Sequence, residues 1–156
     1  MRLMALHSPN YGMRRGFDYP KLIIIHGTWM DDFHQALDRL CDPKTQVSAH
    51  YAIAQHGETY RLVPEHLRAW HAGKSHWQGV DDINSASIGI ELDNDGTSPY
   101  DARQIDSLIQ LCRDLCLRYG LSSHQILGHS DIAPTRKDDP GVLFPWQTLK
   151  KGLEGL

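Results

Sequence analysis

Residues 128–141 gather side chains that bind metals or move protons. The segment reads GHSDIAPTRKDDPG and holds one histidine, one lysine, one arginine and three aspartates. Two prolines, Pro134 and Pro140, exclude a regular helix or a central strand, so the segment is expected to be a loop. A loop stiffened by proline can hold ligands in fixed positions, but a solvated turn has a similar composition. The loop alone leaves both interpretations open.

Polar side chains also occur where other predicted strands end. His26 follows residues 21–25, a continuous apolar run typical of a strand buried on both faces. His129 follows a second short apolar run. Glu91 lies in the alternating strand 87–92, on the face opposite its isoleucines. Because open α/β sheets place their sites at strand ends, we expect these three side chains to lie close together.

Two histidines and one carboxylate form a ligand set for a catalytic zinc ion, which takes three protein ligands and leaves one position for water. The carboxylate could come from Asp131, Asp138 or Asp139, and spacing does not choose between them. Each of these residues alone would more often be structural or solvated. Their coincidence with His26 and His129 favours a single zinc ion.

The spacing of apolar residues along the chain predicts the helices and strands that must position these groups. Residues 1–20 show no such periodic spacing and are expected to form an irregular N-terminal arm of the domain. The domain itself is expected to span residues 21–156. Helices are expected near residues 32–41, 100–119 and 145–153, and strands near 21–26, 47–54, 58–63, 87–92 and 125–128. The second and third of these strands form a hairpin. The order indicates a single α/β domain with a mixed central sheet flanked by helices and a zinc site at strand ends.

Composition narrows the classes of function. The chain has 156 residues, ten histidines and a net charge of −3 without a lysine or arginine block, so no nucleic acid or anionic membrane surface is expected as a partner. No apolar run approaches the ~20 residues of a membrane span. Three cysteines form no disulfide framework and favour a reducing compartment.

The N-terminal part bears a superficial likeness to an export signal. Arg14 and Arg15 precede an apolar run, residues 22–25, that is too short for a signal core of 7–15 residues. We therefore expect no signal peptide and a cytoplasmic protein. The alternative is a periplasmic or secreted protein whose export leader has been trimmed.

Five motifs, in order along roughly residues 8–150, resemble those of the zinc N-acetylmuramoyl-L-alanine amidases of the amidase-2 family. This family includes cell-wall-recycling anhydromuramyl-peptide amidases, certain phage lysozymes and peptidoglycan recognition proteins. The motifs are IHGT at 25–28, SAHY at 48–51, AWHAG at 69–73, SIGIE at 87–91 and the loop at 128–141. Residues 21–156 are thus expected to be an amidase catalytic domain.

The resemblance implies a role for each matching residue. His26, His129 and Asp139 match the zinc ligands of the family. Glu91 matches the catalytic glutamate, which would carry a proton from water to the departing amine. Lys137 matches the lysine beside the metal, which would stabilise the tetrahedral oxyanion.

Four further residues are expected in or near a substrate groove. Trp70, His71 and Arg136 resemble positions that bind substrate. His50 is also a candidate, as a substrate-binding or auxiliary residue, although a structural histidine packed beside Tyr51 is equally compatible with the sequence. The remaining histidines are expected to be structural or exposed.

The implied activity is zinc-dependent hydrolysis of the amide between N-acetylmuramic acid, or its anhydro form, and L-alanine of the stem peptide, in cell-wall turnover or recycling. A monomer is expected, with peptidoglycan or a muropeptide as its partner. One alternative is a non-catalytic peptidoglycan-binding module, against which the complete ligand set and the presence of Glu91 and Lys137 argue. Another is a phage-type enzyme acting on intact wall, which the acidic net charge disfavours.

Overall fold

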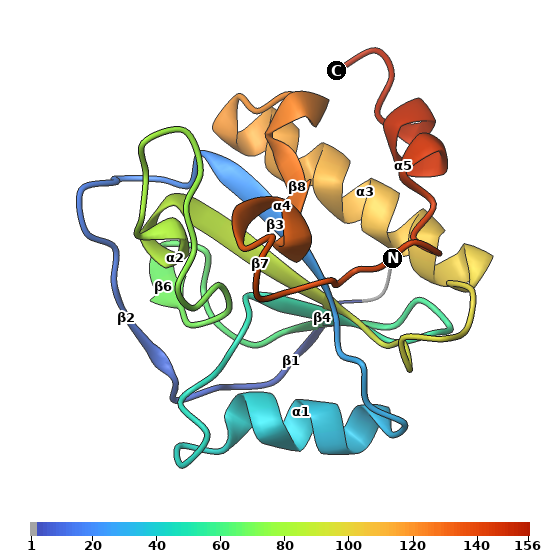
Figure 1. Cartoon of the computed structure of the whole chain (residues 1–156), viewed down its shortest axis with the longest axis horizontal. Helices are drawn as coiled ribbons and strands as arrows, with labels where there is room; N and C mark the ends of the chain where they lie inside the picture. The colour runs from blue at the N-terminus through green and yellow to red at the C-terminus, as the bar shows by residue number, and fades with distance from the viewer. Residues whose placement is uncertain (1–2) are drawn as a thin grey trace.

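A computed structural model describes residues 3–156, and its centre is a six-stranded mixed sheet (Figure 1). In spatial order its strands are β1 (Leu3–Ala5), β5 (Thr59–Arg61), β4 (Tyr51–Ile53), β7 (Ser87–Leu92), β3 (Leu22–Gly27) and β8 (Ile126–Gly128). The hairpin pair β4 and β5 is antiparallel, whereas β3 runs parallel to both β7 and β8. The carboxyl ends of β3, β7 and β8 therefore lie along one edge of the sheet.

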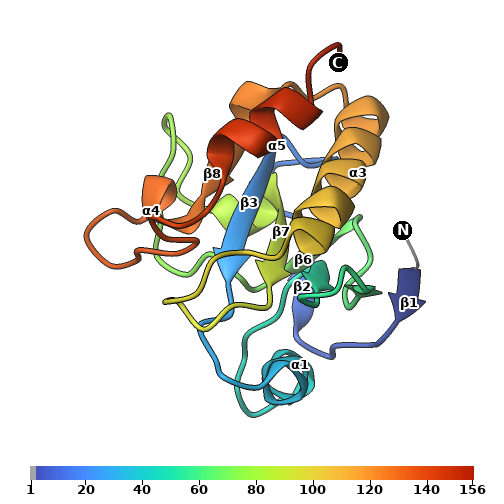
Figure 2. The ribbon, with the colours of Figure 1, turned by 90° about the vertical axis from the view of Figure 1, so that its right-hand side faces the viewer.

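Helices cover both faces of this sheet. The helices α3 (Ala102–Tyr119) and α5 (Trp146–Gly152) lie together on one side, and α1 (Phe33–Cys41) lies apart from them (Figure 2). The α3 face packs on the odd-numbered isoleucines of β3, while Leu22 and Ile24 of the same strand pack into a cluster on the opposite face. The expected strand with two buried faces is confirmed, as is the mixed sheet flanked by helices.

The main helices begin and end where the sequence predicts. The carboxylate of Asp32 accepts hydrogen bonds from the backbone of α1, and that of Asp101 does the same for α3. Gly120 ends α3 in the left-handed conformation, with φ of 65°, which glycine adopts without a steric penalty. The α1 helix packs Leu37 and Leu40 against the hairpin side of the sheet.

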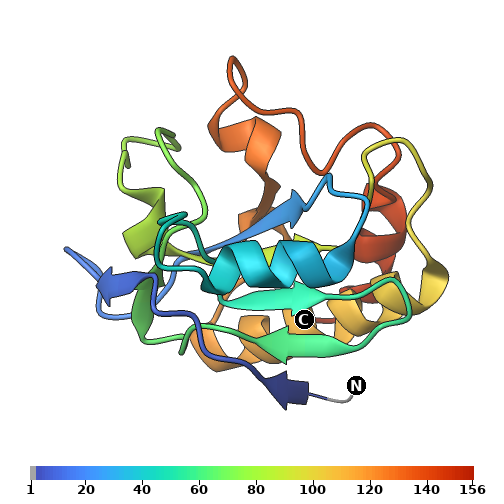
Figure 3. The same cartoon turned by 90° about the horizontal axis from the view of Figure 1, so that it is seen from below.

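The N-terminal arm, of which the structure describes residues 3–20, contains two short strands that the expectation of an irregular segment did not include. Strand β1 pairs in parallel with β5 (Figure 3), and β2 (Tyr11–Met13) pairs antiparallel with β6 (Leu67–Ala69). Strands of three residues are too short to show periodicity, and their backbone partners lie far away in sequence. Between them, Asn10 donates side-chain hydrogen bonds to the carbonyls of Asp42 and Val47.

Two segments outside the expected helices and strands contain short regular elements. The loop at 128–141 opens with one turn, α4 (His129–Ile132), which ends before Pro134. Residues 64–84 contain β6 and the beginning of α2 (Ile83–Ala86). Such short elements carry too few residues for an amphipathic pattern. No helix within residues 3–156 is long and apolar enough to cross a bilayer.

A fully buried histidine joins the hairpin to β7. The Nδ1 atom of His50 accepts the backbone N–H of Gly89 at 3.0 Å, and its Nε2 donates to the carbonyl of Leu67 at 2.9 Å. These contacts use both nitrogens of the neutral ring. Burial lowers the pKa of His50 to about 3, well below the ~6.5 of an exposed histidine.

The buried His50 predicts a loss of stability in acid. Because the unfolded chain binds a proton at this residue below pH ~6.5 and the folded chain does not, its contribution is present above pH ~6.5 and declines as the pH falls toward 3. We expect the free energy of unfolding of metal-free His50→Asn to depend less steeply on pH between 6 and 4, by up to about 1.4 kcal/mol per pH unit. Urea titrations at several pH values measure this, and equal slopes for the two proteins would contradict it.

Candidate metal and catalytic site

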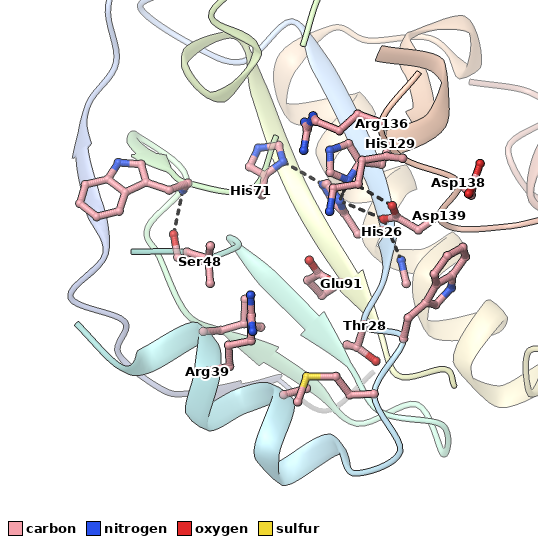
Figure 4. Close-up of a pocket in the computed structure, with 18 residues that line it drawn as sticks. His26, Thr28, Arg39, Ser48, His71, Glu91, His129, Arg136, Asp138 and Asp139 are labelled. Atoms are coloured by element: carbon pink, nitrogen blue, oxygen red, sulfur yellow. Dashed lines mark hydrogen bonds and ion pairs between the residues drawn. The ribbon is translucent and has the colours of Figure 1, made fainter. Parts of the chain in front are cut away.

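A pocket of about 480 Å³ opens at the carboxyl edge of the sheet (Figure 4). His26 at the end of β3 and Glu91 on β7 form its floor, because these two residues are paired in the register of the parallel strands. His129, the first residue of α4, and Asp139 close one side. The parallel strands thus bring together the groups expected to meet, although His26 and Glu91 are 65 positions apart in the sequence (91 − 26).

Three potential ligand atoms converge in this pocket. The Nδ1 atoms of His26 and His129 are 3.0 Å apart; that of His26 lies 3.3 Å from Oδ2 of Asp139, and that of His129 lies 3.2 Å from Oδ1 of the same carboxylate. All three side chains are buried and can direct one ligand atom each at a common ion. Tetrahedral zinc with bonds of about 2.0–2.1 Å separates neighbouring ligand atoms by roughly 3.3 Å.

The hydrogen bonding of the ligands supports a cation rather than a purely structural cluster. Nε2 of His129 lies 2.9 Å from the carbonyl oxygen of Ala72, so this nitrogen carries the proton and Nδ1 presents a lone pair. Burial lowers the pKa of His26 to about 4, which keeps that ring neutral at neutral pH. Neutral imidazole nitrogens and a carboxylate are the donor set that zinc prefers, so the residues present fit this ion.

The structure distinguishes between the three aspartates of the loop. Asp131 accepts the backbone N–H of Gly128 at 2.7 Å and so caps α4. Asp138 is exposed and lies apart from the ligand atoms (Figure 4). Asp139 is buried, and its carboxylate also accepts the backbone N–H of Gly27 at 3.3 Å. The expected ligand group of His26, His129 and Asp139 is therefore the one that the fold brings together.

Glu91 occupies the position of a proton-transfer group. Its Oε2 atom is buried, and no residue among 3–156 makes a hydrogen bond to it. Burial and the nearby Asp139 carboxylate raise the pKa of Glu91 to about 8. Glu91 as a whole is partly exposed and lines the pocket, and a pKa near neutrality suits a general acid or base.

Lys137 and Arg136 enter the pocket from the loop. Arg136 donates from Nη2 to the carbonyls of Ala72 and Lys74, at 2.7 and 2.8 Å, and thereby ties the loop to residues 72–74. A side chain at Gly73 would approach this guanidinium to 3.0 Å, and φ at Gly73 is +60°. Arg136 therefore holds the loop against residues 72–74 and also lines the pocket.

The other predicted substrate-binding residues divide into two groups. Trp70 is half-buried and lines the pocket, as expected, while its backbone N–H donates to Ser48 Oγ at 2.8 Å. His71 also borders the pocket but is buried, and its two ring nitrogens contact His26 and Ser87. His50 does not line the pocket: its ring is fully buried and both nitrogens are hydrogen-bonded, which agrees with the structural alternative for this residue.

Several pocket residues were not predicted from the sequence. Arg39 lies on the side of α1 that faces Glu91 (Figure 4), and Trp29 follows the IHGT motif with an unusual φ of +49°. Arg39 lines the pocket because α1 packs beside it, and Trp29 lines the pocket because it lies in the loop before α1. An arginine on the polar face of a helix carries no sequence signal that separates it from a solvated one.

Comparison with known proteins identifies the family of this chain. The model of the N-acetylmuramoyl-L-alanine amidase family matches residues 16–142. N-acetylmuramoyl-L-alanine amidase AmiD of Escherichia coli is 44% identical over 149 residues, covering 84% of this chain and 53% of AmiD. The 1,6-anhydro-N-acetylmuramyl-L-alanine amidase AmpD of Enterobacter cloacae is 37% identical, covering 89% of this chain and 83% of AmpD. This chain thus spans about half the length of AmiD but most of the length of AmpD.

Solved structures show the same architecture. A selenomethionine derivative of AmpD superimposes with a TM-score of 0.87 at 31% identity, covering 97% of this chain and 94% of that one. E. coli AmiD in complex with anhydro-N-acetylmuramic acid-L-Ala-D-γ-Glu-L-Lys gives a TM-score of 0.79 at 38% identity, with coverages of 93% and 66%. The family expected from the five motifs is confirmed, and the chain belongs to the N-acetylmuramoyl-L-alanine amidase family.

Proposed function

We propose that this protein is a zinc-dependent amidase that hydrolyses the bond between N-acetylmuramic acid, or its anhydro form, and L-alanine of peptidoglycan stem peptides. The observation that carries the proposal is the convergence of His26, His129 and Asp139, with contacts of 3.0–3.3 Å between their side-chain nitrogen and oxygen atoms, beside Glu91 in the same pocket. Membership of the amidase family supplies the class of bond.

His26, His129 and Asp139 would hold one zinc ion. Zinc in a site of this kind lowers the pKa of water to about 7 and polarises an amide carbonyl. Glu91 accepts a proton from the attacking water and passes it to the nitrogen of the departing L-alanine, so that one carboxyl group serves as base and then as acid. Its place in the pocket lining, next to His26 in the register of β3 and β7, supports this role.

Lys137 stabilises the negative oxygen that develops as water attacks the carbonyl. Its position in the pocket wall, two residues before Asp139, places an ammonium group on the loop that supplies the third ligand. The exposed Asp138 lies between them in sequence and has no assigned role. Trp70 and Arg136 form the walls against which we propose that the muropeptide lies.

Soluble muropeptides with an anhydro sugar are the substrates that we favour. E. coli AmiD has been solved with such a compound, and AmpD of E. cloacae is named for the 1,6-anhydro sugar. One chain supplies all three ligands, which supports a monomer. The three free thiols, of which Cys112 and Cys116 are buried on α3, support a reducing compartment and hence a role in recycling.

A chelator-controlled hydrolysis assay tests the activity. N-acetylmuramoyl-L-Ala-D-γ-Glu-L-Lys and its 1,6-anhydro form are incubated with the zinc-loaded protein and analysed by mass spectrometry. We expect release of the free tripeptide, faster from the anhydro compound, and loss of release after chelation with recovery on adding zinc. Absence of release from both compounds by protein shown to contain zinc would contradict the proposal and favour a binding module.

Substitution of Glu91 and His129 separates proton transfer from metal binding. Because Glu91 is not a ligand, Glu91→Gln is expected to retain one zinc ion and lose about 10²–10⁴-fold in kcat. His129→Ala is expected to lose zinc as well as activity. Metal content by mass spectrometry and turnover of the muropeptide check both results. A metal-free Glu91→Gln protein, or one with near wild-type turnover, would show that the role of Glu91 is misassigned.

Lys137→Met preserves side-chain length and removes the ammonium charge. Zinc content is expected to be unchanged, and kcat is expected to fall about 10²–10³-fold with a smaller change in KM, as for loss of an oxyanion donor. Steady-state kinetics with metal analysis measure this. If zinc is lost in parallel with activity, Lys137 supports the loop and not the transition state.

A further inference from the structure

The segment His71–Ala72 touches both histidine ligands from the side opposite the proposed ion. Nδ1 of His71 lies 2.9 Å from Nε2 of His26, and the carbonyl oxygen of Ala72 lies 2.9 Å from Nε2 of His129. Each ligand thus has its distal ring nitrogen engaged by one of two consecutive residues. This arrangement differs from the substrate-binding role expected for His71.

The carbonyl of Ile83, which can only accept, fixes the direction of the hydrogen bonds that link it through Ser87 to His71. Ser87 Oγ lies 2.6 Å from the carbonyl oxygen of Ile83, which can only accept, so the single hydroxyl proton of Ser87 is used there. The contact at 3.0 Å between Ser87 Oγ and His71 Nε2 then requires that the ring donate. A neutral His71 with its proton on Nε2 presents Nδ1 as an acceptor.

The same reasoning continues to the ligand. Because His71 Nδ1 is an acceptor, Nε2 of His26 must carry the proton that joins the two rings. The remaining nitrogen of His26, Nδ1, is left with a lone pair, and this is the atom that faces His129 and Asp139. The chain from Ile83 through Ser87 and His71 therefore selects the tautomer of His26 that can bind a metal.

We propose that His71 is a positioning residue which, held by Ser87, fixes His26 in its metal-binding tautomer and orientation, while the adjacent Ala72 carbonyl does the same for His129. This inference deepens the proposed function and rests on the proposed metal site. Residues that hold the distal nitrogen of a metal-binding histidine commonly contribute 10–100-fold to metal affinity.

Gly89 and Asn84 hold His71 and Ala72 in this arrangement. A Cβ atom at Gly89 would lie 2.3–2.6 Å from the ring of His71, so the ring can occupy its place over β7 because residue 89 has no side chain. The side-chain oxygen of Asn84 accepts the backbone N–H groups of both His71 and Ala72, at 3.0 and 2.8 Å. The turn that supplies the Ile83 carbonyl therefore also anchors the two residues that orient the ligands.

Zinc affinity of His71 variants tests the proposal. We compare wild type, His71→Leu and His71→Asn by competition with a chromophoric chelator. His71→Leu removes the acceptor and is expected to weaken the zinc Kd about 10–100-fold. In His71→Asn the amide oxygen lies close to the former position of Nδ1, so most of this loss is expected to be recovered. Equal affinity of His71→Leu and wild type would overturn the proposal.

A neighbouring buried histidine provides the matched control. The ring of His50 lies 6.0 Å from that of His71, between centroids, but its nitrogens contact neither ligand. His50→Leu is expected to lower the free energy of unfolding without weakening the zinc Kd of the folded protein. A loss of zinc affinity equal to that of His71→Leu would mean that general loosening of the core explains both, and would overturn the specific role of His71.

Nitrogen-15 NMR of the histidine rings tests the tautomers without variants, metal or substrate. In metal-free wild type at pH 7.5, His71 and His26 are each expected to carry the ring proton on Nε2. A proton on Nδ1 of either ring would contradict the proposed chain of hydrogen bonds. Wild-type protein with these tautomers but no zinc binding would refute the metal site of the proposed function, whereas zinc binding unaffected in His71→Leu would refute the positioning role alone.

Discussion

The packing of two imidazole nitrogens and a carboxylate against one another is the constraint on which the site depends. Nδ1 of His26 and of His129 face each other at 3.0 Å, with Asp139 close to both. Both rings direct lone pairs toward this point and their protons away from it, so the three groups repel one another unless a cation lies between them. The metal ion that we propose would remove this repulsion.

The fold supplies this arrangement through three parallel strands and one face of β7. Strands β3 and β8 each end at a ligand, and the register of β3 with β7 places Glu91 beside His26. Along the same face of β7, Ser87 holds His71, Gly89 makes room for its ring, and Glu91 borders the pocket. The opposite face packs against α3. One alternating strand therefore supports the ligands, seats their positioning residue and provides the proposed catalytic group.

Strong periodicity made most of the fold predictable, and strand alternation alone placed Glu91 on the correct face. The spacing of the aspartates in the sequence did not show that Asp139, and not Asp131, is the candidate ligand. The two residues differ only in their tertiary contacts, because Asp131 caps α4 and Asp139 is buried. The five motifs identified the family, yet both His50 and His71 remained candidates for substrate binding. Tertiary packing separates them, since the ring of His50 hydrogen-bonds the backbone of Gly89 and Leu67, whereas the ring of His71 contacts a ligand. The short strands of the N-terminal arm depend on distant partners and left no periodic signal.

Anomalous diffraction at the zinc absorption edge, from crystals of the zinc-loaded protein, would test the central claim most directly. The account predicts a single strong peak within about 2.0–2.2 Å of Nδ1 of His26, Nδ1 of His129 and a carboxylate oxygen of Asp139, with Glu91 outside bonding distance. A peak bonded to Nε2 of either histidine, a peak bonded to Glu91 in place of Asp139, or no peak between these residues would contradict it.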